Sequence, residues 1–309
     1  MTVRPCPVCS SPDTRFFARA WDSEYCTTAD VFEYARCQTC KVIFLDPPPI
    51  GRLAQLYPKN YYALTGGGSD SFPKRVKDWL DGRLFRRILT RIPGDRLSVL
   101  DVGGGSGWLL SLIRQQNPRV VDTHEVDLDE SARAAAEAAG HVFHCMRVED
   151  FHCERQFDLI LLLNIVEHVA DPGLVLRTMA ARLAPDGQVL VKTPNTDTLD
   201  LRLFQHRNWG GFHCPRHWVL FNRETFVDLA RRSGLTCEWM RYTQGAPQWT
   251  NSILGWLADR GILRISAERP MHMHPLHAPL LALTAALDFA RLPFMKTAQM
   301  FVLLKRSRP

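Results

Sequence analysis

Residues 99–107 read Val-Leu-Asp-Val-Gly-Gly-Gly-Ser-Gly, so an apolar run ends in Asp101 and is followed by Gly103, Gly105 and Gly107. Glycine is needed where a chain turns tightly and where a ligand must approach bare backbone. The turn leads into a predicted helix that begins near Trp108, and the free N–H groups of a helix start favour an anion. A turn that only caps a helix would have the same glycines. The neighbouring segments must therefore show whether this turn binds a ligand or only begins a helix.

Two common phosphate-binding motifs do not fit this turn. A dinucleotide fingerprint requires G-x-G-x-x-G. Counted from Gly103 or Gly105, its last position falls on Trp108 or Leu110. A Walker A loop is excluded because no Gly-Lys-Ser/Thr follows. The sequence therefore disfavours a pyrophosphate site.

Strand and helix patterns alternate outward from the turn. The segment 157–163 is almost continuously apolar, which is typical of a strand buried on both faces. Alternating strands and helices predict an α/β fold with a doubly wound, mostly parallel, seven-stranded sheet. We expect its strands at 97–102, 120–126, 142–144, 157–163, 187–192, 235–242 and 300–305, with helices at 108–116, 129–139, 172–183 and 222–233 and a helical insertion at about 249–292.

Acidic residues lie at or just past the ends of three successive predicted strands. Asp101 ends the first, Asp127 ends the second, and Glu149 and Asp150 follow the third. Ligands bind at the carboxyl ends of strands in open α/β sheets, and a carboxylate has enough acceptors to hold a diol. Asp129 is a weaker candidate, because it could simply cap the next helix.

The turn resembles motif I of the class I S-adenosylmethionine (SAM) methyltransferases, which have a Rossmann-like fold. The segments FDLILLLNIVEHVADP (157–172), APDGQVLVKTPN (184–195) and GGFHCPRHWVLFNRETFVDLARRSGL (210–235) resemble later parts of the same family. The resemblance implies that Asp127 accepts hydrogen bonds from the SAM ribose, that Asp101 lies near its methionine end, and that Glu149 or Asp150 contacts its adenine amine. The expected cofactor-binding set is Asp101, Gly103, Gly105, Gly107, Asp127, Glu149, Asp150 and Asn164.

Histidines in these segments are the candidate bases. Methyl transfer requires donor and acceptor held in line, and a base can remove the acceptor proton. Histidine titrates near neutrality, so His168, His213 and His217 all qualify. His168 could instead pack beside SAM, and the other two could be substrate ligands or surface residues. Glu167 and Tyr62 complete the expected catalytic set.

One difference bears on metal binding by this part of the chain. Ubiquinone-type O-methyltransferases share the Glu167-His168 pair, and they carry another glutamate where this chain has Asn164. Glu167 and His168 alone make an incomplete metal shell.

Cys6, Cys9, Cys37 and Cys40 form two C-x2-C pairs, which can close a tetrahedral Zn²⁺ site. Four thiolates leave no open position, so the zinc would be structural. Unligated buried thiols are the alternative, and Cys26 could replace one ligand. Some SAM methyltransferases that act on sugars and related metabolites carry a similar module, followed by segments like FLDPPP and LYPKNYY.

The expected organisation has three parts. Residues 1–46 form a zinc ribbon, 47–95 a linker or lid with a helical segment, and 96–309 the methyltransferase domain. Tyr57, Tyr61 and Tyr62 either cover the acceptor site or pack between domains, and Gly66–Gly68 would supply mobility.

Composition limits the class of protein. The 309 residues carry a net charge of +6 that is spread along the chain, so a nucleic-acid partner is disfavoured. No apolar run is long enough to cross a bilayer, and the N-terminus lacks the apolar region of a secretory signal. A cytoplasmic location is expected. The apolar segment 276–294 predicts a core or dimer contact, with peripheral membrane docking as the alternative.

We therefore predict an enzyme that transfers a methyl group from SAM to a small-molecule or glycan acceptor, such as a sugar, a nucleotide sugar or a secondary metabolite. The chain would act as a monomer or a homodimer. Two alternatives are an NAD(P)-dependent oxidoreductase and a nucleic-acid-binding zinc ribbon fused to a degenerate methyltransferase domain.

Overall fold

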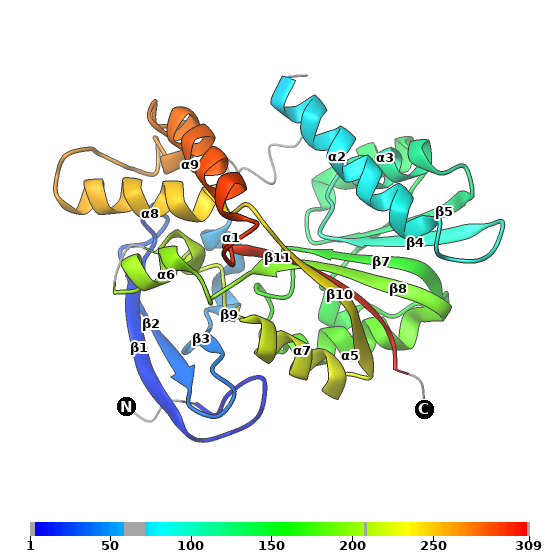
Figure 1. Ribbon diagram of the computed structural model, residues 1–309, viewed down its shortest axis with the longest axis horizontal. Helices are drawn as coiled ribbons and strands as arrows, with labels where there is room; N and C mark the ends of the chain where they lie inside the picture. The colour runs from blue at the N-terminus through cyan, green and yellow to red at the C-terminus, as the bar shows by residue number, and fades with distance from the viewer. Residues whose placement is uncertain (1–3, 59–71, 207–208, 308–309) are drawn as a thin grey trace.

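A seven-stranded sheet forms the larger part of the molecule (Figure 1). The computed structural model describes residues 4–58, 72–206 and 209–307. The strand order is β10-β11-β8-β7-β4-β5-β6. β11 is antiparallel to both of its neighbours, and the other four pairings are parallel. The strands are β4 (Leu97–Val102), β5 (Val120–Asp127), β6 (Val142–Cys145), β7 (Phe157–Leu163), β8 (Leu183–Pro194), β10 (Leu235–Thr243) and β11 (Gln299–Arg306). This confirms the predicted doubly wound, mostly parallel sheet.

Helices cover both faces of this sheet. α2 (Phe72–Leu89) and α3 (Trp108–Gln116) lie on one side, and α5 (Pro172–Arg182) and α7 (Arg223–Arg232) lie on the other (Figure 1). All six residues of β4 are buried, because helices pack on both of its faces. The strand order reverses between β4 and β7, and open α/β sheets bind their ligands at the carboxyl ends of the strands at such a point.

Two predicted elements differ in detail. The helix expected at 129–139 starts as a 3-10 turn (Glu130–Ala132) and continues as α4 (Arg133–Ala138). Asp129 begins the turn because its side chain accepts a hydrogen bond from the Ser131 N–H, at 3.0 Å. β8 begins at Leu183, earlier than expected, because Leu183 already pairs with Phe157 of β7.

A second, four-stranded sheet has the order β1-β2-β3-β9. Its strands are β1 (Thr14–Trp21), β2 (Val31–Cys37), β3 (Ile43–Leu45) and β9 (Val219–Leu220). The last strand comes from the segment just before α7, so the N-terminal module (residues 4–46) and the larger sheet share one apolar core. Trp209, Phe212 and Trp218 are buried in this core together with Tyr34 of β2.

The segment between the module and the large sheet is described only in part. It contains a 3-10 turn (Ile50–Arg52), α1 (Leu53–Leu56) and, after the gap, α2. Tyr61, Tyr62 and Gly66–Gly68 lie outside the described residues.

The C-terminal insertion contains α8 (Ala246–Asp259), a 3-10 turn (Met271–Met273) and α9 (His277–Arg291); α6 (Leu199–Phe204) and a 3-10 turn (Gly210–Phe212) lie earlier in the chain. The buried residues of α9 are polar, Thr284 and Asp288, whereas Leu283, Leu287 and Phe289 are exposed. Among the helices of the described segments, none is both long and apolar enough to span a bilayer.

A buried ion pair joins the N-terminal module to the segment before β9. Arg216 makes two hydrogen bonds to Asp22, at 3.1 and 2.9 Å, and both side chains are fully buried. The Arg216 Nε also donates to the Leu56 carbonyl, at 2.7 Å. Burial alone would raise the pKa of Asp22, but hydrogen bonds and the charge of Arg216 outweigh it and lower this pKa. Loss of one partner would leave an uncompensated buried charge.

Asp22→Asn is expected to lower the free energy of unfolding by about 3–5 kcal/mol, since Arg216 would keep its charge without a counter-ion. Urea denaturation followed by tryptophan fluorescence measures this change. Asp30→Asn is the matched control, because Asp30 pairs with Arg52 at the surface, where ion pairs contribute little. Equal stability of the two variants would contradict a structural role for the buried pair.

Candidate functional site

The turn after β4 offers bare backbone to the crevice. Gly103, Gly105 and Gly107 have φ values of 77°, 63° and 72°, a left-handed region that side chains rarely adopt. Among the described residues, a Cβ on Gly105 would have one atom within 4 Å, Asp127 Oδ2 at 4.0 Å, so none of their side chains fills the space above this glycine. A Cβ on Gly107 would lie 2.4 Å from the His141 ring, so this position needs glycine for packing as well.

Asp127, at the end of β5, holds the turn directly. Its Oδ2 accepts a hydrogen bond from the Gly105 N–H at 3.0 Å, and its Oδ1 accepts one from the Asp129 N–H at 2.8 Å. Each carboxylate oxygen has a second lone pair, so the side chain can still accept hydrogen bonds from a diol. Burial raises the pKa of Asp127. Asp129, by contrast, caps the 3-10 turn that follows.

Beneath the turn lies a pair of buried carboxyl groups, Asp101 and Glu125. The two residues are register partners on β4 and β5. A Cβ on Gly104 would lie 2.3 Å from Asp101 Oδ2 and 2.6 Å from Glu125 Oε2. The Gly104 N–H donates to Glu125 Oε1 at 2.7 Å. Burial, with Asp127 nearby, raises the pKa of Asp101 to about 7, and burial beside Asp101 raises that of Glu125 to about 11.

Glu125 was missed by the sequence analysis. The signal was present, because Glu125 and Asp127 are two residues apart on a strand and therefore point to the same face. Its burial could not be read from that spacing.

The remaining predicted cofactor residues lie on two loops. Glu149 and Asp150 are in a 3-10 turn (Val148–Asp150) soon after β6; Glu149 pairs with Arg147, and Asp150 is exposed. Asn164 follows β7 with φ 58°, and its buried Oδ1 has no hydrogen-bond partner among the described residues. These positions flank the turn at the strand ends, which fits a ligand that extends across β4, β5 and β6.

His168, His213 and His217 form one cluster. The ring centroids of His168 and His217 are 4.7 Å apart, those of His213 and His217 5.0 Å, and those of His168 and His213 6.2 Å. Burial lowers the pKa of His168 to about 3, with a further contribution from His213. Burial and the two neighbouring histidines also lower the pKa of His217. The structure thus brings together three residues that the sequence singled out separately.

Glu167 adds a buried carboxyl group to this cluster. One carboxylate oxygen of Glu167 and one ring nitrogen each of His168 and His217 all lie within 4.8 Å of one another. Glu167 is 0% exposed, and neither of its oxygens makes an ordinary hydrogen bond within the described ranges. Burial raises the pKa of Glu167 to about 8. Of the predicted catalytic residues, only Tyr62 lies outside the described part of the chain.

The N-terminal module and the segment after it also reach the histidine cluster. His213 Nδ1 lies 2.9 Å from Glu24 Oε2, and the Tyr57 hydroxyl lies 3.0 Å from His168 Nδ1. Tyr25 packs against His213 with ring centroids 6.3 Å apart. Sequence analysis named Tyr57 but not Glu24 or Tyr25. No motif marks these two residues, because their contacts join segments that are far apart in the sequence.

The four predicted cysteines also come together. The Sγ atoms of Cys6 and Cys40 are 3.6 Å apart, and those of Cys9 and Cys37 are 3.5 Å apart. All four sulfurs lie within 4.8 Å of one another, and Cys26 is not part of the group. Tetrahedral zinc with Zn–S bonds of about 2.3 Å places its sulfurs at about 3.8 Å. The donor set and its spacing therefore fit a structural zinc ion.

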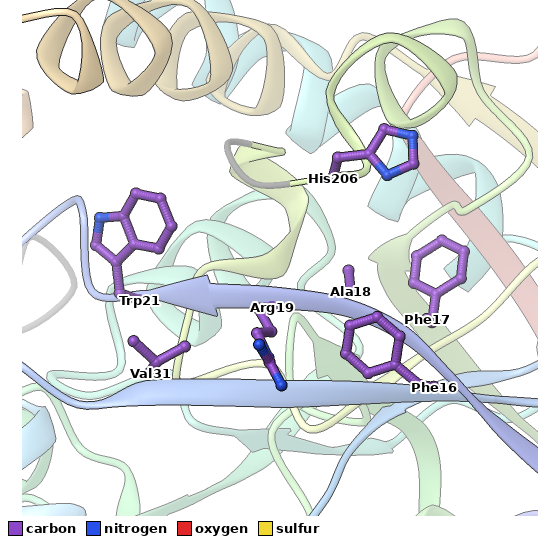
Figure 2. Close-up of a pocket in the computed structure, with 7 residues that line it drawn as sticks. All are labelled: Phe16, Phe17, Ala18, Arg19, Trp21, Val31 and His206. Atoms are coloured by element: carbon purple, nitrogen blue, oxygen red, sulfur yellow. The ribbon is translucent and has the colours of Figure 1, made fainter.

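A separate hollow of about 290 Å³ lies along β1 and the start of β2 in the four-stranded sheet. Figure 2 shows its lining side chains, six from β1 and β2 and one that follows α6: Phe16, Phe17, Ala18, Arg19, Trp21, Val31 and His206. Arg19 is paired with Glu33. The lining includes no residue of the glycine turn, its acidic neighbours or the histidine cluster, so we do not assign the candidate site to this hollow.

Together, the doubly wound sheet, the glycine turn after its first parallel strand and the acidic residue after the second define a class I SAM-dependent methyltransferase. The chain matches the family described as "Methyltransferase domain" over residues 74–238, more than half of its length, and belongs to that family. This agrees with the predicted methyltransferase class and not with the oxidoreductase alternative.

Two curated proteins that are similar to this chain share the same name. A ubiquinone biosynthesis O-methyltransferase of Bradyrhizobium diazoefficiens is 34% identical over 192 residues, which cover 60% of this chain and 66% of that protein. The protein of the same name from Nitrobacter winogradskyi is 35% identical over 122 residues, 38% of this chain and 41% of its own. The chain thus spans less than two thirds of the length of these two relatives.

A solved structure was also found to be similar. Coclaurine N-methyltransferase bound to N-methylheliamine and SAH aligns over 84% of this chain and 82% of its own, with 15% identity and a TM-score of 0.49.

The raised pKa of Glu167 predicts a pH-dependent stability. The folded protein holds a proton on Glu167 up to about pH 8, whereas the unfolded chain releases it near 4.5. Wild type should therefore lose stability as pH rises through this window, by up to about 1.4 kcal/mol per pH unit from this group. Glu167→Gln should remove that contribution. Urea denaturation at pH 5 and pH 8 measures it, and exposed Glu154→Gln is the control. Parallel pH profiles for wild type and Glu167→Gln would contradict the prediction.

Proposed function

We propose that the protein transfers the methyl group of SAM to a small-molecule acceptor. One observation carries this proposal: the Gly105 N–H is hydrogen-bonded to Asp127 at a strand end, with open space above the glycine. An acidic residue next to bare backbone suits a ligand with a ribose diol and a cationic amino-acid end. The family match supports the same reaction.

SAM supplies an electrophilic methyl group on a sulfonium when bound. Asp127 would accept hydrogen bonds from the ribose hydroxyls, and Glu149 or Asp150 would contact the adenine amine. Asp101 would lie near the methionine end, where a positive charge would stabilise the ionised form of its buried carboxyl group. Asn164, whose buried Oδ1 has no hydrogen-bond partner in the described part of the chain, would accept a hydrogen bond from the ligand.

The acceptor would lie between the glycine turn and the histidine cluster. His168, His213 and His217 offer ring nitrogens to an acceptor proton, and Tyr57 reaches the same cluster from the segment after the module. A hydroxyl-bearing metabolite fits such a polar lining. A sugar or nucleotide sugar is the proposed class, with a glycan or other metabolite in the same range. A phenolic acceptor is the second candidate, favoured by the O-methyltransferase name of the relatives.

The four cysteines would hold a structural Zn²⁺. Four thiolates complete a tetrahedral shell, so the ion would stabilise the module and take no part in methyl transfer. Backbone N–H groups of Val8 and Cys40 point at the Cys6 and Cys37 sulfurs, each at 3.4 Å, and would help to hold the thiolates.

Peripheral membrane contact through 276–294 stays a prediction. The exposed Leu283, Leu287 and Phe289 of α9 support it.

Turnover tests the proposal most directly. Purified protein is incubated with SAM and, in turn, 3,4-dihydroxybenzoate as a phenol probe and dTDP-glucose as a nucleotide-sugar probe. Mass spectrometry then follows a gain of one methyl group. SAM or its demethylated product copurifying with the native protein would support the proposal. The proposal would be overturned if calorimetry detected binding of neither SAM nor its demethylated product.

Asp127→Ala is expected to weaken SAM affinity by at least tenfold. The substitution removes a carboxylate that would accept from the ribose diol and that accepts from the Gly105 N–H. Calorimetry measures this change. Asp129→Ala is the matched control, because Asp129 caps the 3-10 turn and would leave affinity nearly unchanged. Equal affinities for wild type and Asp127→Ala would count against the assigned cofactor site.

The purified protein is expected to contain about one equivalent of zinc by plasma mass spectrometry. Cys37→Ser should lose the metal and lower the thermal midpoint, because structural zinc contributes to folding. Cys237→Ser is the control, since Cys237 is outside the cluster. Metal-free wild-type protein with full stability would indicate four free thiols.

A further inference from the structure

The three clustered histidines differ in their hydrogen-bond partners. His217 Nδ1 lies 2.8 Å from the Gly211 carbonyl, and His168 Nδ1 lies 3.1 Å from the Arg216 carbonyl. His213 Nδ1 lies 2.9 Å from a carboxylate oxygen of Glu24. Within the described ranges, His213 is thus the member of the cluster that is hydrogen-bonded to a carboxylate. Both partners are buried, His213 at 7% and Glu24 at 8% exposure.

A carboxylate partner changes what an imidazole can do. An ionised carboxylate only accepts hydrogen bonds, so Nδ1 must carry the proton and Nε2 must carry the lone pair. The same carboxylate stabilises the imidazolium that forms when Nε2 takes a proton. A carbonyl partner fixes the tautomer too, but it supplies no charge. This is the arrangement in which a carboxylate orients a histidine base in hydrolase triads.

We propose that Glu24 is a positioning residue that makes His213 the general base of the methyl transfer. The proposal rests on the proposed function and assigns one role within it. In the transfer, the S–CH3 bond breaks and sulfur keeps the electron pair, which leaves a neutral thioether. The acceptor heteroatom forms a bond to the methyl carbon and gives its proton to His213 Nε2. The resulting imidazolium faces the carboxylate of Glu24.

The placement of Glu24 is fixed from several sides. It lies in the connection between β1 and β2, next to Asp22, whose Oδ1 accepts from the Tyr25 N–H at 3.0 Å. The Glu24 carbonyl accepts from the Met271 N–H at 2.8 Å. The N-terminal module and the C-terminal insertion therefore both hold the backbone of this part of the chain.

Other charged or titratable groups surround the pair. His168, His217 and Tyr25 contact the His213 ring, and the Arg216 charge is balanced by Asp22. His272 packs against Tyr25 with centroids 5.5 Å apart and, with His277, lies within the electrostatic reach of Glu24. The carboxylate of Glu24 is within direct hydrogen-bond distance of His213 Nδ1, at 2.9 Å.

The test reads the tautomer of His213 directly. Full-length protein labelled with ¹⁵N at histidine is measured by long-range ¹H–¹⁵N correlation at neutral pH, and His213→Gln assigns the signals. Wild type is expected to show a pyrrole-type Nδ1 and a pyridine-type Nε2 for His213. Glu24→Leu should move His213 toward a mixture of tautomers, while the signals of His168 and His217 keep their pattern.

Glu33→Leu is the matched control, because Glu33 is an exposed glutamate of the same module. It should leave all three histidines unchanged. If Glu24→Leu does not fold, Glu24→Gln replaces it. Its amide group can donate as well as accept a hydrogen bond, so His213 should again move toward a mixture of tautomers.

Two results would overturn the proposal. One is a wild-type His213 that carries its proton on Nε2, and the other is a His213 signal that is the same in wild type and in the folded Glu24 variants. Neither result depends on binding of SAM or its demethylated product. Failure of the proposed function would appear separately, as a loss of that binding in calorimetry with the His213 tautomer intact.

Discussion

The buried pair of Arg216 and Asp22 is the contact on which the candidate site depends. It fastens the N-terminal module to the segment that carries His213 and His217, and the same guanidinium reaches the chain at Leu56. Two charges in a dry interior are costly unless they are well hydrogen-bonded. Here both Asp22 oxygens and three guanidinium nitrogens are used, so the pair fixes the relative position of three segments that are distant in the sequence.

The surroundings of the glycine turn differ from this ion pair, because they bring acidic side chains close to one another. Asp101, Glu125 and Asp127 all lie under or beside the turn, and burial raises the pKa of each. A cationic ligand would reverse part of that shift by favouring the ionised forms. These buried acids would therefore favour the binding of a positively charged molecule at the turn.

Sequence reasoning predicted the parts of the molecule whose physical cause is local. The run 157–163 predicted a central strand because burial on both faces leaves few polar positions. The helix expected at 222–233 forms as α7, and the Asn222 side chain accepts from the Thr225 N–H at its start. The four cysteines could be grouped from their pairing alone. The strand and the helix start depend on residues that are neighbours along the chain, and each cysteine pair shows the short C-x2-C spacing.

Contacts between distant segments could not be predicted in this way. Asp22 and Glu24 belong to no recognisable motif. Their partners lie far along the chain, Arg216 194 residues after Asp22 and His213 189 residues after Glu24. Glu125 looked like any charged residue in a strand, since its burial depends on how β4 and β5 align. The pairing of β3 with β9 was missed because two residues of strand are too short to show a period.

That last pairing has a consequence for how the protein could be divided. β3 would otherwise end its sheet with unpaired backbone groups, and such edges invite association with other chains. β9 covers this edge from within the same molecule. Removing the N-terminal module would expose an unpaired strand on each fragment, so truncated forms should associate through these edges. The two parts are therefore expected to fold together and to be inherited together.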